Sequence, residues 1–380
     1  MQFSVKQQLI VALIAALVCS PTIAAEEEIR EVLQTWRQQQ QRFHAVRFKI
    51  SGTLTRPDGY TLLPAGNDYK NLVPASAESE QVAIESTLLF DFTHGRLRRH
   101  LIKASGMWVP EENAWRSFPF DQVVTYEGTQ WQSYTPHELN LAKAALPDRQ
   151  GTELAIYSNQ PRRIVFDVEH IPLLIACGMI RTVLVFEPHD FTPAINDHDF
   201  RLDGRHQLDE NQCLVLRTIP DPMGYFFEYW VDIHDHRMIR RMMTYKSTDP
   251  PKLRLNTSIE YSETEHGPLP KNWRVEKADF MTDKVSVYQV SLDEFEANPI
   301  LSDSDFQIAP PPGTRVHDER RPRDSRDYVV MGAGEPELPV GEFEARQEQR
   351  KSRFALFAGL AIVMFLVAGA VVVLRRRRSS

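Results

Sequence analysis

The chain has 380 residues, of which 42% are hydrophobic, and it carries a formal net charge of −7 at pH 7. Residues 26–353 are more acidic, with a formal charge of −12, because Lys6 and the four arginines at 375–378 lie outside this region. An acidic surface repels phosphate backbones, and no basic stripe interleaved with aromatic residues interrupts it, so the composition argues against nucleic-acid binding.

The chain begins with the pattern of a secretory signal peptide. Lys6 precedes an apolar stretch at residues 9–18 that is too short to span a bilayer, and small residues follow at Ala24 and Ala25. We therefore predict cleavage between Ala25 and Glu26 and export of the rest of the chain.

The exported region opens with a predicted amphipathic helix that is followed directly by a strand. From residue 26 to 43, apolar side chains recur every three or four positions among polar ones. These apolar residues are Ile29, Val32, Leu33, Trp36 and Phe43. The period then changes to two at residues 46–54, which is typical of a strand with one buried face.

Many further segments alternate in the same way. Residues 84–92 and 97–101 flank His94-Gly95, and residues 123–126 and 131–134 flank Glu127-Gly128, so each set predicts a hairpin. More strands are predicted at 213–219, 225–233, 238–245, 258–261, 273–280 and 285–292. This spacing predicts an antiparallel sheet with many strands.

Two segments differ from this pattern. Residues 171–186 are the most apolar of the exported region, but Pro172, Gly178 and Arg181 interrupt them, and we predict a buried helix or plug that lies on the sheet. Residues 319–353 are rich in Arg, Glu, Pro and Gly, which predicts a flexible tether.

Near its end the chain has an uncharged stretch, residues 354–374. As a helix these 21 residues would cross the hydrocarbon core of a bilayer, which is about 30 Å thick. The arginines that follow place the tail at 375–380 in the cytoplasm by the positive-inside rule. We expect a single-pass protein of the bacterial inner (cytoplasmic) membrane, with its bulk on the periplasmic side. A sorting signal removed after export is the alternative.

Five parts of the chain occur in an order known from one superfamily. They are the opening helix with Trp36, the strand at 48–52, the segment at 126–131, the hairpin at 229–241 and the closing segment at 306–316. Together they resemble the periplasmic lipoprotein-carrier superfamily, called LolA-like or LolB-like. The resemblance implies a strongly curved, incomplete antiparallel barrel closed by helices, with an apolar hollow that takes acyl chains.

The predicted fold class is therefore α+β, a strongly curved antiparallel β-sheet (incomplete barrel) with packed helices, plus a single C-terminal transmembrane helix. The predicted organisation is a signal peptide at 1–25, a LolA-like exported β-domain at 26–318, a flexible tether at 319–353, a transmembrane helix at 354–374 and a basic tail at 375–380. This chain is longer than the carriers and has large inserts. A protein anchored in the membrane cannot diffuse as a carrier does, so a role as a receptor, sensor or acceptor is favoured over a role as a carrier.

Aromatic residues crowd two regions of the exported part. Sheet cores explain many of them, but a hollow would be lined by some, because binding cavities are largely apolar with a few placed polar groups. The candidate cavity residues are Trp108, Trp115, Phe120, Tyr126, Trp131, Phe227 and Tyr229.

Motifs that would indicate catalysis are absent from the sequence: it has no Gly-x-Ser-x-Gly elbow, no His-Glu-x-x-His pair, no phosphate loop and no Cys-x-x-Cys. We predict no enzyme activity and no cofactor. Asp232, His234 and His236 would share one face of a strand and could hold a metal, but a polar turn between two strands is the favoured interpretation. Whether Cys177 and Cys213 form a disulfide stays open.

The function expected from these observations is that of an exported, membrane-anchored protein of the cell envelope. Its β-domain would bind or sense a lipid or lipoprotein acyl group, and an envelope protein could be a further partner. Two alternatives remain. One is an envelope module for protein interaction or structure that has no ligand, and the other is a metal-assisted hydrolase that uses residues 232–236.

Overall fold

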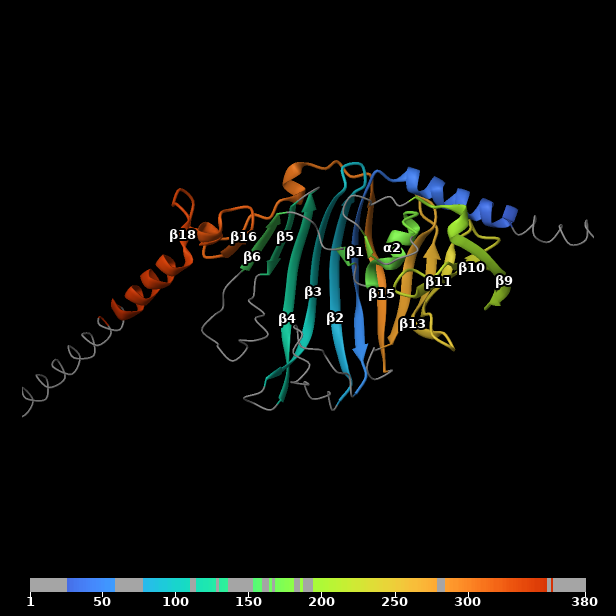
Figure 1. Ribbon diagram of the computed structural model, residues 1–380, viewed down its shortest axis with the longest axis horizontal. Coiled ribbons are helices and arrows are strands. Elements are labelled where there is room, and N and C mark those ends of the chain that lie inside the picture. The colour runs from blue at the N-terminus through green and yellow to red at the C-terminus, as the bar shows by residue number, and fades with distance from the viewer. Residues whose placement is uncertain are drawn as a thin grey trace, which may run out of the picture.

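A large β-sheet dominates the molecule (Figure 1). The computed structural model describes residues 26–58, 78–109, 114–127, 130–135, 153–158, 164–165, 168–180, 185–186, 194–278, 284–353 and 357. Within them the chain forms a 16-stranded sheet and a separate two-stranded sheet of β7 (Ile164–Val165) and β8 (Val185–Phe186).

The strands of the large sheet come from nearly the whole described chain. Its first half contains β1 (Ala45–Arg56), β2 (Glu80–Asp91), β3 (Arg96–Val109), β4 (Ala114–Glu127), β5 (Gln130–Thr135), β6 (Glu153–Ser158), β9 (Phe200–Leu208) and β10 (Asn211–Thr218). Its second half contains β11 (Tyr225–Asp232), β12 (Ile239–Lys246), β13 (Lys252–Ser262), β14 (Leu269–Ala278), β15 (Val285–Ala297), β16 (Arg315–Asp318), β17 (Asp327–Val329) and β18 (Leu338–Pro339).

The described helices are few. Two longer ones cover residues 26–42 and 340–353. The short ones are α2 (Ile171–Ala176) and the 3₁₀ turns η1 (Val168–His170), η2 (Asp197–Asp199), η3 (Asp303–Phe306) and η4 (Arg323–Ser325).

The strand order explains why the sheet stays open. It runs β18-β17-β16-β6-β5-β4-β3-β2-β1-β15-β14-β13-β12-β11-β10-β9, so β1 and β15, which are far apart in the sequence, are hydrogen-bonded neighbours at its centre. The two end strands, β18 and β9, do not pair with each other. Neighbouring strands are antiparallel except for β6 and β16, which run parallel.

The predicted fold class was therefore wrong. The sheet is mixed, because β16 returns from a distant part of the chain to extend it beside β6, and few described helices accompany it. Among the residues that the structure describes, no helix combines the length and the apolar character needed to cross a bilayer. Nearly all of the predicted span at 354–374 lies outside those residues, as does the predicted signal peptide at 1–25.

The local predictions for residues 26–56 are confirmed. The helix at 26–42 buries Val32, Leu33 and Trp36, and β1 follows at once with alternating burial. We call the sheet face that carries Phe48 and the other core residues the inner face, and the opposite face the outer face. Side chains of the inner face and of the helices form the main hydrophobic core.

Residues 319–353, predicted to be a flexible tether, contain η4, β17, β18 and the helix at 340–353. The carboxylate of Asp318 is buried and accepts hydrogen bonds from the Arg320 guanidinium at 2.7 and 2.8 Å. The Arg321 guanidinium lies 3.8 Å from the centre of the Tyr328 ring. These contacts order the start of the segment, and the division of the chain into domains stays a prediction.

Gly52 lies where β1 meets β15, and its lack of a side chain is a packing requirement. A Cβ atom there would lie 2.3 Å from the carbonyl oxygen of Gln289 and 2.9 Å from Cα of Val290, both backbone atoms. We expect Gly52→Ala to lower the free energy of unfolding by about 1–3 kcal/mol, because the central strand pair must separate to admit a methyl group. Urea denaturation would measure the loss. Gly332→Ala is the control, since a Cβ at Gly332 would have no atom within 4 Å, and an equal loss in both variants would contradict the explanation.

Candidate ligand-binding face

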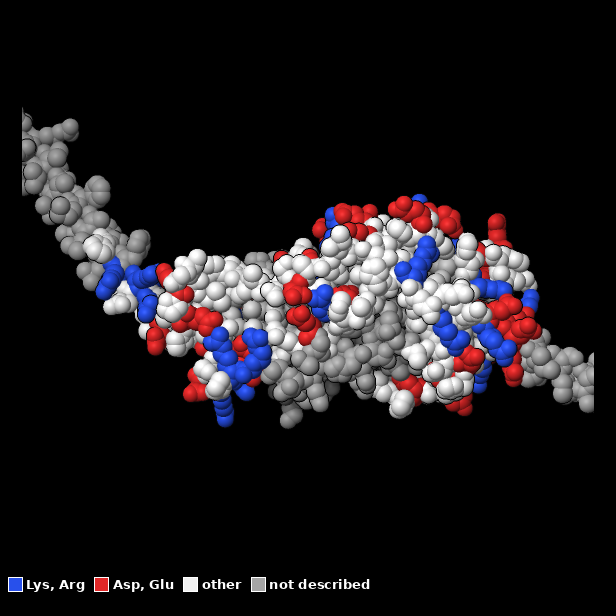
Figure 2. All heavy atoms as spheres, turned by 90° about the horizontal axis from the view of Figure 1, so that it is seen from above, with Lys and Arg blue, Asp and Glu red and all other residues white. Residues whose placement is uncertain are grey.

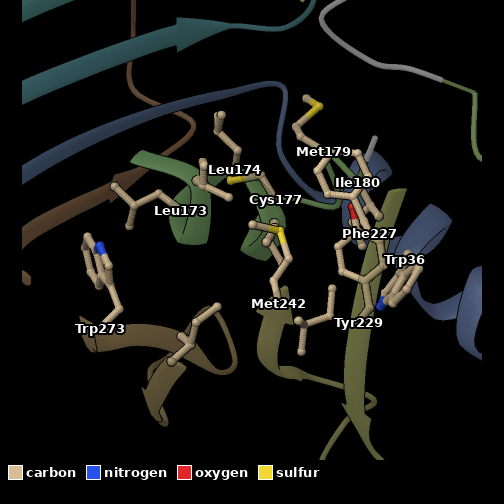
Figure 3. Packing of buried hydrophobic residues seen from close by; sticks show 14 of the residues in the cluster. Trp36, Leu173, Leu174, Cys177, Met179, Ile180, Phe227, Tyr229, Met242 and Trp273 are labelled. Carbon is tan, nitrogen blue, oxygen red and sulfur yellow. The ribbon is translucent and has the colours of Figure 1, made fainter. Parts of the chain in front are cut away.

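The inner face of the sheet carries α2, which is buried along its whole length (Figure 1). Pro172 lies in the first turn of α2, where its fixed φ suits a helix and its missing N–H costs no hydrogen bond. Leu173, Leu174 and Cys177 belong to the same hydrophobic cluster as the sheet residues Met242 and Trp273 (Figure 3). The apolar segment predicted to be a buried plug therefore does lie on the sheet.

Two contacts fix α2 in place. At its beginning, the indole Nε1 of Trp273 on β14 donates a 2.9 Å hydrogen bond to the carbonyl oxygen of Glu169. At its end, Gly178 has a φ of +73° and packs directly against the helix at 26–42. A Cβ on Gly178 would lie 2.5 Å from the carbonyl oxygen of Trp36, so only glycine allows this approach.

The predicted cavity residues are brought together only in part. Tyr126, Phe227 and Tyr229 are buried and belong to the same hydrophobic core as α2. Trp131 is partly buried at the edge of this core, and its ring stacks on Tyr157 with 4.9 Å between centroids.

The other three predicted cavity residues are Trp108, Trp115 and Phe120. Their backbones lie in β3 and β4, where Trp108 and Trp115 are paired, and their side chains are outside the described part of the structure. That the seven residues line a ligand cavity stays a prediction. The sequence analysis did not include Met242 and Trp273 among the residues that face α2. The only indication in the sequence is that each lies in a segment predicted to be a strand with alternating burial.

Most side chains of the inner face around α2 are apolar or are phenols, and the ionisable residues Glu169 and His170 are buried just before α2 begins. Burial raises the pKa of Tyr126 to about 12 and raises the pKa of Tyr229 as well, so both phenols stay protonated at physiological pH. Two hydroxyl groups on this face, Thr244 Oγ1 and Thr257 Oγ1, are buried and have no hydrogen-bond partner among the described residues. The face is thus apolar with a few polar positions, which suits an uncharged ligand.

The outer face has a different character. A groove of about 740 Å³ crosses it, lined by Arg240, Glu260, Asn272, Arg274 and Gln289, among others. Within the groove the Asn272 amide donates to a Glu260 carboxylate oxygen at 3.1 Å. The lining of this groove is mixed, because Leu208, Ile259 and Val290 lie beside the charged and amide residues.

The weak metal candidates do not converge. Asp232 ends β11, and its buried carboxylate accepts hydrogen bonds from the backbone N–H groups of His234 and Asp235 at 2.9 and 3.1 Å. It also pairs with Arg240 at 3.2 Å. His236 lies in the following turn with a φ of +49°, so the alternation expected of a strand no longer applies. The polar-turn interpretation is confirmed.

A different set of side chains meets beside this turn. Ligand atoms of Asp235, His236 and Glu263 lie within 4.8 Å of one another. Glu263 follows β13 and is distant in the sequence, so no local motif could have pointed to it. His236 and Glu263 are exposed and Asp235 is already paired with Arg240, so we assign no metal site here.

Both cysteines in the described part of the chain, Cys177 and Cys213, are free and buried. Cys177 caps the end of α2 within the core, and burial raises the pKa of its thiol. Cys213 lies on β10 opposite Asp232 of β11, and burial raises its pKa to about 11. The question of a disulfide between them is settled by these positions, which leave two protonated and covered thiols.

Comparisons with known proteins find likenesses among solved structures. No family model matches the chain, and no curated protein matches it. Among solved structures, the chain is similar to a candidate outer membrane lipoprotein-sorting protein domain from Vibrio parahaemolyticus. The match has a TM-score of 0.39 and 10% sequence identity, and it covers 73% of this chain and 97% of that one. The sequence resembles the same class of protein, but a likeness this distant carries no argument about function.

Proposed function

We propose that the β-domain binds or senses an acyl group of a lipid or lipoprotein in the cell envelope. The observation that carries the proposal is α2, a six-residue apolar segment that occupies the inner face. A helix this short is not stable on its own, so its position depends on packing against the sheet. An acyl chain offers the same apolar contacts and can take its place.

The chemistry of the inner face supports an acyl ligand over a charged one. Neutral phenols at Tyr126 and Tyr229 and apolar side chains form most of its surface around α2. The unpartnered hydroxyls of Thr244 and Thr257 can receive the ester or amide group at the head of a chain.

The proposal includes a place in the cell. The signal-peptide pattern at 1–25 supports export of the chain, and we propose that the β-domain works on the periplasmic side of a bacterial envelope. An acyl group there is carried by a membrane lipid or by a lipoprotein, and either can be the partner.

Alkylation of Cys177 tests the proposal. This thiol is 1% exposed at the end of α2, and burial raises its pKa, so it should react slowly with N-ethylmaleimide. Adding a synthetic tripalmitoylated lipopeptide to the full chain should displace α2 and speed the alkylation of Cys177 by about tenfold or more. Peptide mass spectrometry would follow each cysteine separately.

The chain contains its own control. Cys213 is 0% exposed on β10 and is not part of the hydrophobic core that contains α2, so its alkylation rate should not change with the lipopeptide. If both thiols accelerate together, the lipopeptide merely unfolds the domain. Failure of Cys177 to respond would exclude displacement of α2 and remove the proposal.

A further inference from the structure

Lys277 places a positive charge on the inner face near the end of β14. Val275, two residues before it, is buried in the main hydrophobic core, and alternate residues of a strand share a face. The Lys277 side chain is half-buried, and its ammonium group makes no ion pair or hydrogen bond with any residue that the structure describes. A charged group that is partly withdrawn from water is usually paired with an opposite charge. Lys277 therefore suits an anionic ligand.

Three buried hydroxyl groups share the inner face with Lys277. Ser286 on β15 is directly opposite Lys277, and Thr257 on β13 is diagonal to it. Thr244 on β12 lies one strand further, opposite Leu255, which itself pairs with Lys277. The three hydroxyl residues are at most 4% exposed, and the oxygen of each has no hydrogen-bond partner among the described residues. Directly opposite and diagonal side chains have Cβ atoms about 5 to 8 Å apart, which a long lysine side chain can bridge.

The acidic side chains at neighbouring positions are engaged elsewhere. Glu276 points to the outer face, where it accepts a 2.9 Å hydrogen bond from the Asn256 amide. Glu80, at this end of the inner face, pairs with Arg56 at 2.8 Å. Asp279 and Asp283 follow Lys277 in sequence and lie outside the described residues.

The opposite ends of the strands have a different arrangement of charge. Figure 2 shows that side from above, and basic and acidic side chains lie side by side on it. Nearer those ends, Arg47 pairs with Glu296 at 2.6 Å and Lys49 pairs with Glu294 at 2.9 Å. Lys277 has no such partner in the described part of the chain, so its charge is available to a ligand.

We propose that Lys277 and the hydroxyls of Thr244, Thr257 and Ser286 bind the anionic head group of an acyl lipid, which is a carboxylate or a phosphate. All four groups can donate hydrogen bonds, and carboxylate and phosphate oxygens accept them. A neutral ester would satisfy the hydroxyls but would leave the ammonium group without a partner. The inference rests on the proposed function, because the acyl chain of the same lipid takes the place of α2.

The spacing along β14 fits such a lipid. Trp273, which bonds to the carbonyl oxygen of Glu169 just before α2, lies four residues before Lys277 on the same face. At the rise of a strand this separation is about 13 Å. One leaflet of a bilayer, half of a hydrocarbon core about 30 Å thick, gives an acyl chain a length of about 15 Å. A chain at the position of α2 can therefore reach Lys277 with its head group.

Three lipids with the same palmitoyl chain test the head group. Native mass spectrometry of the full chain would measure the affinities for palmitate, palmitoyl lysophosphatidylglycerol and monopalmitoylglycerol, which carry a carboxylate, a phosphate and a neutral head. At least one anionic lipid should bind about tenfold more tightly than the neutral one, because charge-assisted hydrogen bonds are the strong ones. Preference for palmitate alone would identify a free fatty acid as the ligand, and preference for the phosphate lipid would identify a phospholipid.

Substitutions assign the preference to one side chain. Lys277→Met should remove it and leave the affinity for monopalmitoylglycerol unchanged, while Lys277→Arg should keep it. Lys271→Met is the matched control and should also keep it, because Lys271 is exposed at the other end of β14.

Two results would overturn the inference and leave the proposed function standing. One is equal affinity for the three lipids in the wild type, as when Asp279 neutralises Lys277, and the other is a preference that persists in Lys277→Met. If none of the three lipids binds, the acyl site itself is rejected together with its head-group site.

Discussion

Replacing Trp36 with alanine should lower the free energy of unfolding by about 3–5 kcal/mol, because it removes the largest side chain that joins the helix at 26–42 to the sheet. The Trp36 side chain is 1% exposed. Its ring packs edge-on against Phe200 at 5.8 Å and Tyr229 at 5.9 Å between centroids. The cavity left by alanine cannot close easily, because strands hold both partner rings. Urea denaturation followed by circular dichroism would measure the loss.

The same substitution should loosen the end of α2. The helix at 26–42 contacts Gly178 through its backbone, so its displacement should speed the alkylation of Cys177 even without lipid. Gln38→Ala is the control on the exposed side of the same helix and should change stability by less than about 0.5 kcal/mol. Similar losses in Trp36→Ala and Gln38→Ala would show that helix propensity matters here more than packing.

Replacing Arg96 with methionine should cost about 3–5 kcal/mol at neutral pH, because it leaves the carboxylate of Asp91 buried without its partner. The Arg96 guanidinium donates to Asp91 Oδ2 at 2.7 and 3.0 Å and to Asp303 at 2.8 Å. It also lies 4.4 Å from the centre of the Phe306 ring. Arg96 thus ties η3 to the hairpin of β2 and β3.

The pH dependence of this effect follows from the pKa of Asp91. Burial alone would raise that pKa, but hydrogen bonds from Arg96 and His94 outweigh burial and lower it below its usual value. Because the pKa of Asp91 is lower in the folded state than in the unfolded state, its ionised carboxylate stabilises the fold. This contribution is complete at pH values above the unfolded-state pKa, and it is lost as the pH falls through the folded-state pKa. The free energy of unfolding should therefore decrease at pH values below about 4. The difference in free energy of unfolding between wild type and Arg96→Met should become smaller in the same range.

Arg47→Met is the matched control for the ion pair. Arg47 pairs with Glu296 at 2.6 Å on the exposed surface, where water screens the charges. Its loss should cost less than about 1 kcal/mol. Urea denaturation of both variants at neutral and acid pH gives the comparison, and a gap that widens toward acid pH would contradict the assignment to Asp91.

The parts of the fold that depend on neighbouring residues could be predicted from the sequence. The helix at 26–42 and β1 follow from a change of apolar period from about four to two, and the structure has both. The buried segment at α2 was expected from its apolar composition. The turn at Asp232 was expected from its polar residues. Each of these depends on the burial of residues a few positions apart.

The parts that depend on distant residues could not be predicted. Nothing local shows that β16 runs parallel beside β6, or that Glu263 lies next to His236. The outer groove is likewise built from several strands at once. These features arise from the register between strands, which the pattern of a single strand does not contain.

The amino-acid sequence by itself determined many of the segments that become helix, strand or turn, because apolar period and turn residues act over a few positions, but it did not reveal β9 or the helix and strands within residues 319–353. Only the tertiary structure decided the order of the strands, the open edges of the sheet and the place of α2 on its inner face. The physical reason is that pairing between distant strands and burial of a shared face are properties of the whole chain.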